Sequence, residues 1–136
     1  MQQADLIRDR LEAESAANPQ LGRLLEDDTE SGIFVKNLEN VQGDERDVIM
    51  ISVTYAPSPT GAMRMQFGPL GQAGGERRWN VLVTRAKQQV VVFSSIEPED
   101  IKLERISATA KGVHHMRAYL ELARDGVERA REKSMR

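Results

Sequence analysis

The amino-acid sequence predicts an α/β domain in which amphipathic helices cover the two faces of a layered sheet. Two apolar runs rich in β-branched residues, 48–55 and 89–95, are typical of strands, and the first lacks the alternation of a half-solvated strand. Apolar residues recur at steps of three and four in 76–87 and from about 112 to 131, which predicts helices there. The length of 136 residues suits one domain with one core, spanning residues 1–136.

The first half of the chain is expected to contribute a further helix and a further strand. Apolar residues at helical spacing predict a surface helix over 2–16, which Asn18-Pro19 ends. The run 33–38 has the composition of a strand. The predicted connections are a polar segment at 26–32 with a short helix before it at 21–25, a hairpin-like excursion at 56–67 and a glycine-rich loop at 68–75.

Composition narrows the classes of function. With 19 Lys and Arg against 21 Asp and Glu the formal charge is −2, so the sequence carries no overall basic footprint for nucleic acid. The sequence has no cysteine, which excludes disulfides and thiolate ligands, and no apolar run reaches the ~18 residues of a membrane span. We therefore expect a cytoplasmic protein without membrane contact. His114 and His115 are adjacent and would point apart on a helix, so we expect no metal between them.

A dense polar segment at 37–47 lies between two predicted strands, with Gly43 near its centre. Glycine lets a backbone approach a ligand closely, and neighbouring carboxylates can accept hydrogen bonds from sugar hydroxyls. On composition alone, a solvated turn is the stronger interpretation. Asp44 and Glu45 do not fit a Walker B magnesium site, because they precede the strand at 48–55 and do not follow it.

A second cluster, 74–87, is a basic helix entered through two glycines. Arg78 and Arg85 are seven residues apart, so both would lie on one face of that helix. A guanidinium on a rigid helix suits phosphate because its planar donors can bind two oxygens at once. A solvated basic face is the competing interpretation. The chain contains no Gly-Lys-Ser/Thr sequence, which excludes a P-loop NTPase complete in itself.

Taken together, the segments 37–49 and 77–87 resemble motifs V and VI of superfamily 1 DNA/RNA helicases, in their order and in their separation. The likeness is greatest to the 5′-to-3′ branch and to bacterial helicase-related proteins. It implies the second, C-terminal motor domain, a three-layer RecA-like (P-loop NTPase-like) fold with a mostly parallel sheet. The first strand of that fold, which precedes the motif IV helix, has no counterpart in the sequence, so the domain is expected to be truncated at its N-terminus.

The resemblance also implies roles for individual residues. Arg85 matches the arginine finger of motif VI, which stabilises charge developing on the γ-phosphate during hydrolysis. Gly43 and Glu45 match positions of motif V on the nucleotide side. Gln42 and Arg78 are expected to make supporting phosphate or interdomain contacts.

Partners and cofactors follow from the same resemblance. Asn37 stands where the family often has a threonine that contacts the nucleic-acid backbone. The full-length parent is expected to use ATP and Mg²⁺, to bind single-stranded nucleic acid and to supply a preceding RecA-like domain. Without Walker A and B motifs, this chain alone is expected neither to hydrolyse ATP nor to bind it tightly. The alternatives are a non-enzymatic nucleic-acid-binding or protein-interaction module and a stand-alone domain of another role.

Overall fold

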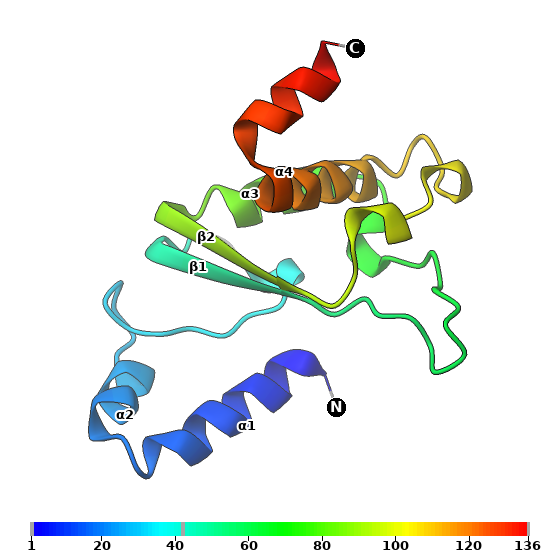
Figure 1. Ribbon diagram of the computed structural model, residues 1–136. Helices are drawn as coiled ribbons and strands as arrows, with labels where there is room; N and C mark the ends of the chain where they lie inside the picture. Colours follow the sequence, from blue (N-terminus) through cyan, green and yellow to red (C-terminus); the bar gives the residue numbers. More distant parts are fainter. Residues whose placement is uncertain (1, 42, 136) are drawn as a thin grey trace.

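The computed structural model describes residues 2–41 and 43–135. It confirms a mixed helix and strand domain, with the N-terminal helix as predicted. No helix in these residues is both long and apolar enough to span a membrane. In chain order (Figure 1) the helices and strands are α1 Gln3–Ser15, α2 Pro19–Glu26, β1 Arg46–Val53, α3 Gly75–Val83, β2 Ala86–Ser94 and α4 Lys111–Ser134.

The sheet of the described chain has two strands, β1 and β2, which pair in parallel. Parallel strands need a crossover connection, and α3 provides it. Ile49 lies opposite Val90, and Ile51 lies opposite Val92. Both strands therefore form where the apolar runs predicted them, and each begins two or three residues earlier than the run.

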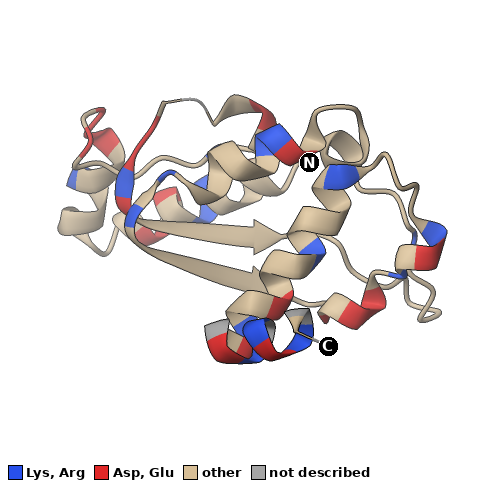
Figure 2. Cartoon of the chain, turned by 90° about the horizontal axis from the view of Figure 1, so that it is seen from above, with Lys and Arg blue, Asp and Glu red and all other residues tan. Residues whose placement is uncertain are grey.

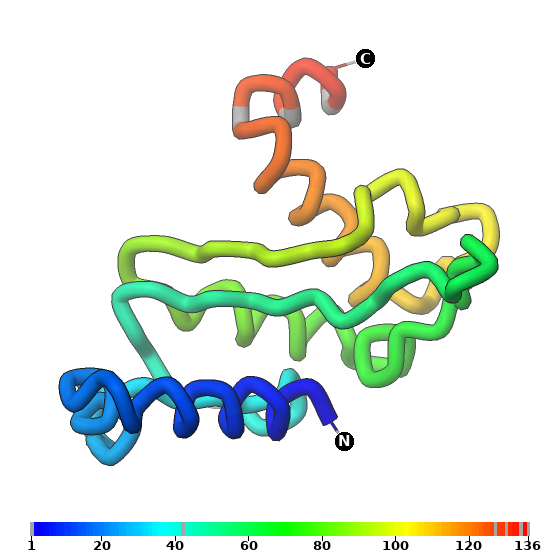
Figure 3. The backbone as a smooth tube through the Cα atoms, turned by 60° about the horizontal axis from the view of Figure 1, so that its bottom comes forward, coloured from blue at the N-terminus to red at the C-terminus, as the bar shows by residue number. Residues whose placement is uncertain are grey.

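Helices α3 and α4 pack together against one face of the sheet (Figures 1 and 3). The buried side chains Ile49 and Ile51 of β1 join Trp79 of α3 and Met116 of α4 in one core cluster. Trp79 also makes an edge-to-face contact with Tyr119, at 5.6 Å between ring centroids. This side of the domain is a closed core built from β1, α3 and α4.

The opposite face of the sheet is largely open. Val48, Met50 and Phe93 are 41%, 69% and 57% exposed. Helix α1 lies on this side (Figure 1), but none of its 13 described residues is buried. It is held to β1 by a 2.8 Å hydrogen bond from Gln3 Nε2 to Ser52 Oγ. Both faces of the sheet thus carry apolar side chains, but only the face under α3 and α4 is closed.

Two predicted β segments do not form strands. Residues 33–37 are extended, but no backbone hydrogen bond joins them to a strand of the described chain, and a 3₁₀ turn, Leu38–Asn40, follows. The prediction was wrong because an apolar run becomes a strand only where a partner strand offers its backbone. The hairpin at 56–67 is also absent from the described structure. There, Met63 and Met65 pack on the core, and Tyr55 donates a 2.9 Å hydrogen bond to Phe67 O.

The boundaries of two predicted helices also differ. Helix α3 ends at Val83, not at residue 87, and Ala86 already begins β2. The long helix α4 extends beyond the predicted 112–131, but its helical geometry breaks at Gly126, where φ is 82° and ψ is 169°. Amphipathic spacing locates a helix without showing where neighbouring structure interrupts it.

Candidate functional site

The two polar segments identified in the sequence meet at one end of the sheet. The backbone N–H of Arg46 donates a 3.1 Å hydrogen bond to the carbonyl of Arg85, and Arg46 lies opposite Ala86 in the strand register. Glu45 and Arg85 are therefore neighbours at the point where both strands begin. Ligands in open α/β sheets usually bind at the carboxyl ends of strands. This candidate site lies at the amino ends.

Arg85 is held against the end of α3. Its Nε donates to Val81 O at 3.1 Å, and its Nη2 donates to Thr84 Oγ1 at 3.3 Å. A cation at a helix C-terminus also interacts favourably with the partial negative charge of the last carbonyls. No hydrogen bond joins the remaining nitrogen, Nη1, to any residue that the structure describes. Arg85 is half-buried as a residue, and its guanidinium keeps donors available for an anion.

The loop before β1 combines a glycine of positive φ with charged neighbours. Gly43 has φ of 68°, which L side chains rarely adopt, and a Cβ added there would meet nothing within 4 Å. Asp44 forms a 2.7 Å ion pair with Lys36. Glu45 is exposed, and its carbonyl accepts a 2.7 Å hydrogen bond from Arg46 Nη1. Gln42, the other predicted residue of this loop, lies outside the described residues.

Arg46 organises the segment beneath the site, a role that the sequence analysis did not predict. Its Nε donates to Gly32 O at 2.8 Å, and its Nη2 donates to Thr29 O at 3.1 Å. The guanidinium also lies 4.9 Å from the centre of the Phe34 ring. Gly32 is buried, and a Cβ there would overlap the carbonyl oxygen of Asp27, so this close approach requires glycine. A basic residue at a strand start, after an acidic connector that ends in glycine, was the available signal.

Contrary to the prediction, Arg78 and Arg85 do not lie on one helix face. Arg85 follows the end of α3, so the two residues do not share a helix face. Arg78 Nη1 instead donates a 3.0 Å, partly buried hydrogen bond to Pro69 O. This contact fixes the loop that precedes α3. A supporting role for Arg78 at the interface with another domain stays a prediction.

Asn37 precedes the 3₁₀ turn that leads into the polar loop. Its Oδ1 atom is enclosed and has no hydrogen-bond partner among the described residues. An unsatisfied buried acceptor is costly, so this side chain is a point where the local arrangement is incomplete. Contact between Asn37 and a nucleic-acid backbone remains a prediction.

The charge distribution does not form a single basic face. Figure 2 shows Lys and Arg interspersed with Asp and Glu on helices and loops, while most of the two strands is uncharged. Within the described residues, no group of three or more His, Cys, Asp or Glu side chains could hold a metal ion. The donors gathered at the candidate site are guanidinium and backbone groups, whose chemistry suits phosphate and not a metal ion.

Comparison with known proteins gives two helicase relatives. The chain is 42% identical over 102 residues to an uncharacterized ATP-dependent helicase of Mycoplasma genitalium, a match that covers 72% of this chain and 8% of that protein. It is 48% identical over 69 residues to the homologue of that helicase in Mycoplasma pneumoniae, covering 51% of this chain and 6% of that protein. The chain therefore spans less than a tenth of the length of these relatives.

The family comparison covers most of the chain and includes the candidate site. No solved structure matches significantly. The AAA domain family matches residues 1–97, which contain both polar segments, Arg85 and both strands. By this match over more than two thirds of its length, the chain belongs to the AAA domain family.

Proposed function

We propose that this chain is the second RecA-like motor domain of an ATP-dependent helicase or translocase. In this proposal, the loop before β1 and Arg85 complete an ATP site whose phosphate loop and magnesium ligands belong to a preceding RecA-like domain. The hydrogen bond between Arg46 N and Arg85 O carries the proposal, because it brings the two motif-like segments to one end of the sheet. The helicase names of the two relatives support the same conclusion.

The residues at this end of the sheet fit one side of a nucleotide. Arg85 offers the donors of Nη1 to phosphoryl oxygens while its other nitrogens stay bound to α3. The open space beside Gly43 lets a ligand approach the backbone. Glu45 carries an exposed carboxylate that can accept hydrogen bonds from ribose hydroxyls. ATP supplies the phosphoryl group when bound, and Arg85 would stabilise the charge that develops on it.

A RecA-like fold would also account for the open side of the sheet. Parallel sheets are normally buried on both faces and contain more than two strands. In the proposed domain, a strand preceding α1 would pair beside β1, and residues 33–37 would then have a backbone partner. The extended conformation of 33–37 supports this arrangement.

The test uses Arg85→Ala in the full-length parent. We expect nucleotide affinity to stay near wild type while single-turnover hydrolysis slows by about 10³-fold or more, as the loss of other arginine fingers does. The charge that Arg85 meets is largest in the transition state, so its loss falls on the chemical step. Arg85→Lys should rescue poorly, because an ammonium cannot reproduce the planar donor geometry.

Arg77→Ala is the matched control, since Arg77 is an exposed arginine on α3 and its loss changes the charge equally. It should hydrolyse ATP at close to the wild-type rate. Wild-type hydrolysis in a folded Arg85→Ala parent would instead favour the alternative, a non-enzymatic nucleic-acid-binding or protein-interaction module. The exposed apolar residues Met50 and Phe93 are the observation that favours this alternative.

A further inference from the structure

The long helix α4 is divided into two limbs at Gly126. Residues 111–125 form the stem, which packs on α3, and residues 127–134 form the arm, which leaves in a different direction (Figure 1). Gly126 has φ of 82° and ψ of 169°, a region of backbone conformation that is essentially restricted to glycine. The bend therefore depends on the one residue type that permits it.

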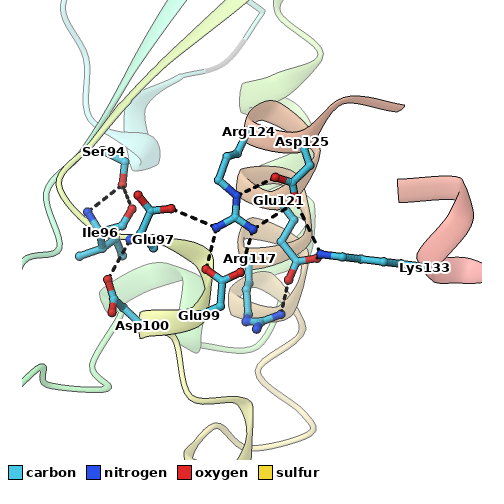
Figure 4. Close-up of polar contacts among 10 residues, drawn as sticks. All are labelled: Ser94, Ile96, Glu97, Glu99, Asp100, Arg117, Glu121, Arg124, Asp125 and Lys133. Atoms are coloured by element: carbon cyan, nitrogen blue, oxygen red, sulfur yellow. Dashed lines mark hydrogen bonds and ion pairs between the residues drawn. The ribbon is translucent and has the colours of Figure 1, made fainter. Parts of the chain in front are cut away.

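The stem is fixed to the body of the domain by ion pairs (Figure 4). Arg124 binds both carboxylate oxygens of Glu99 at 2.7 Å and one oxygen of Glu97 at 3.0 Å. Arg117 donates to Ile101 O at 3.1 Å and to Glu121 Oε1 at 2.6 Å. The Arg124 hydrogen bonds lower the pKa of Glu99 to about 2. These contacts join the stem to the segment that follows β2.

The arm is joined to the stem more weakly. Lys133 Nζ lies 3.6 Å from Glu121 Oε2 and 3.5 Å from Asp125 Oδ2 (Figure 4). Among the described side chains, Lys133 is the one arm residue that forms an ion pair with the stem. These distances exceed those of direct hydrogen bonds, and the Lys133 side chain is 55% exposed. A cavity of about 420 Å³ lined by charged side chains, including Arg129, separates the limbs.

We propose that Gly126 is a hinge and that Lys133 is an ionic latch, so that ionic strength sets the angle between the arm and the stem. Glu121 and Asp125 are four residues apart on the stem, where each also pairs with an arginine of the stem, Arg117 or Arg124. Lys133 adds a further cation between the two carboxylates when the arm is folded back. Salt screens exposed pairs of this kind, with a Debye length of about 30 Å at 0.01 M and about 3 Å at 1 M. Once the latch is screened, Gly126 can adopt helical geometry and α4 can straighten.

The distance between spin labels at the two ends of α4 tests the hinge. The chain has no cysteine, so Lys111→Cys and Met135→Cys supply unique labelling sites. These positions are 24 residues apart and would lie about 36 Å apart along a straight helix, and closer in the bent form. At 0.01 M salt we expect the shorter distance to dominate, and at 1 M salt we expect the population near 36 Å to grow.

Three variants separate the hinge from the latch. Gly126→Ala should show the straight-helix distance at both salt concentrations. Lys133→Gln should show the high-salt distribution already at low salt. Arg129→Gln, which removes the same charge from the same arm, should respond to salt as wild type does. Circular dichroism of each labelled variant confirms that the fold is intact.

Four results would overturn the proposal, two for the hinge and two for the latch. A straight helix in the wild type at 0.01 M salt, or a bent one in Gly126→Ala, excludes Gly126 as the hinge. An unchanged short distance in Lys133→Gln, or in the wild type at 1 M salt, excludes Lys133 as the latch.

Discussion

The two faces of the sheet are built from the same two strands but have different surroundings. Ile49 and Ile51 point into a closed core beneath α3 and α4, while their neighbours Val48 and Met50 point toward solvent on the side of α1. Both sets are apolar. An apolar side chain thus shows that a strand position is suited to burial. Whether that side chain is buried depends on whether another element of the chain packs over it.

The difference in cover implies a difference in stabilisation. Trp79, Val113 and Met116 enclose the closed face, and helices α3 and α4 cross where Gly75 meets Gly112. On the open face, α1 has no buried residue, and Leu6 is exposed. We therefore expect the closed face to provide most of the free energy of unfolding, because hydrophobic stabilisation follows the apolar area removed from water.

Substitutions at adjacent β1 residues give the largest expected contrast. Ile51 is 7% exposed, so Ile51→Ala should lower the free energy of unfolding by about 2–5 kcal/mol through lost burial and a cavity. Met50 is 69% exposed, so Met50→Ala should change it by less than about 0.5 kcal/mol. Urea denaturation of both variants measures the two values. Equal losses would mean that the open face is covered in solution.

The helix crossing on the closed face gives the second contrast. A Cβ added at Gly112 would lie 2.5 Å from the Gly75 carbonyl carbon and 2.6 Å from Leu70 O, so backbone would have to shift. Gly112→Ala should therefore cost about 1–3 kcal/mol, as overpacking does. Gly71→Ala is the control, because an added Cβ there meets nothing within 4 Å. If both variants keep wild-type urea midpoints, the close approach of α3 and α4 does not limit packing.

The same contrast explains how much of the fold the sequence could predict. The strands β1 and β2 and the helix α4 were predictable because their apolar spacing reflects burial inside this chain. Residues 33–38 have equally suitable composition, but strand formation needs a backbone partner, which composition does not reveal. The bend at Gly126 was missed because helical spacing continues on both sides of it.

The separate segments of the candidate site could be predicted from the sequence, but the way in which they come together could not. Two motif-like segments could be identified by residue type, and the parallel pairing then set Glu45 beside Arg85. The sequence offered a signal for the role of Arg46, a basic residue at a strand start, but not its partners Thr29 and Gly32, which depend on how the acidic connector folds under the strand.

The smallest predicted effect concerns the ion pairs that Arg124 of α4 forms with Glu97 and Glu99, at the border of the closed face. Hydrogen bonds from Arg124 lower the pKa of Glu99 from 4.5 to about 2. A carboxyl group whose pKa is lowered on folding stabilises the fold fully above its unfolded pKa, and this contribution is lost as protons bind. The stabilisation by Glu99 should thus be complete above pH 4.5 and should disappear as the pH falls to about 2. Glu99 and Arg124 are exposed, so solvent screening keeps the effect below that of either packing variant.

Thermal unfolding of Glu99→Gln against wild type measures this contribution. The variant should melt at a slightly lower temperature at neutral pH, because Gln keeps the shape of Glu but not its charge. The gap should then close between pH 4.5 and about pH 2, where wild-type Glu99 also becomes neutral. Glu104→Gln is the control, since Glu104 is exposed and forms no ion pair with another described residue. Glu104→Gln should melt close to wild type over the whole interval. If the difference in melting temperature between Glu99→Gln and wild type persists at pH 2, the Glu99 side chain stabilises the fold through packing. The border of the closed face would then be held together by contacts like those of its core.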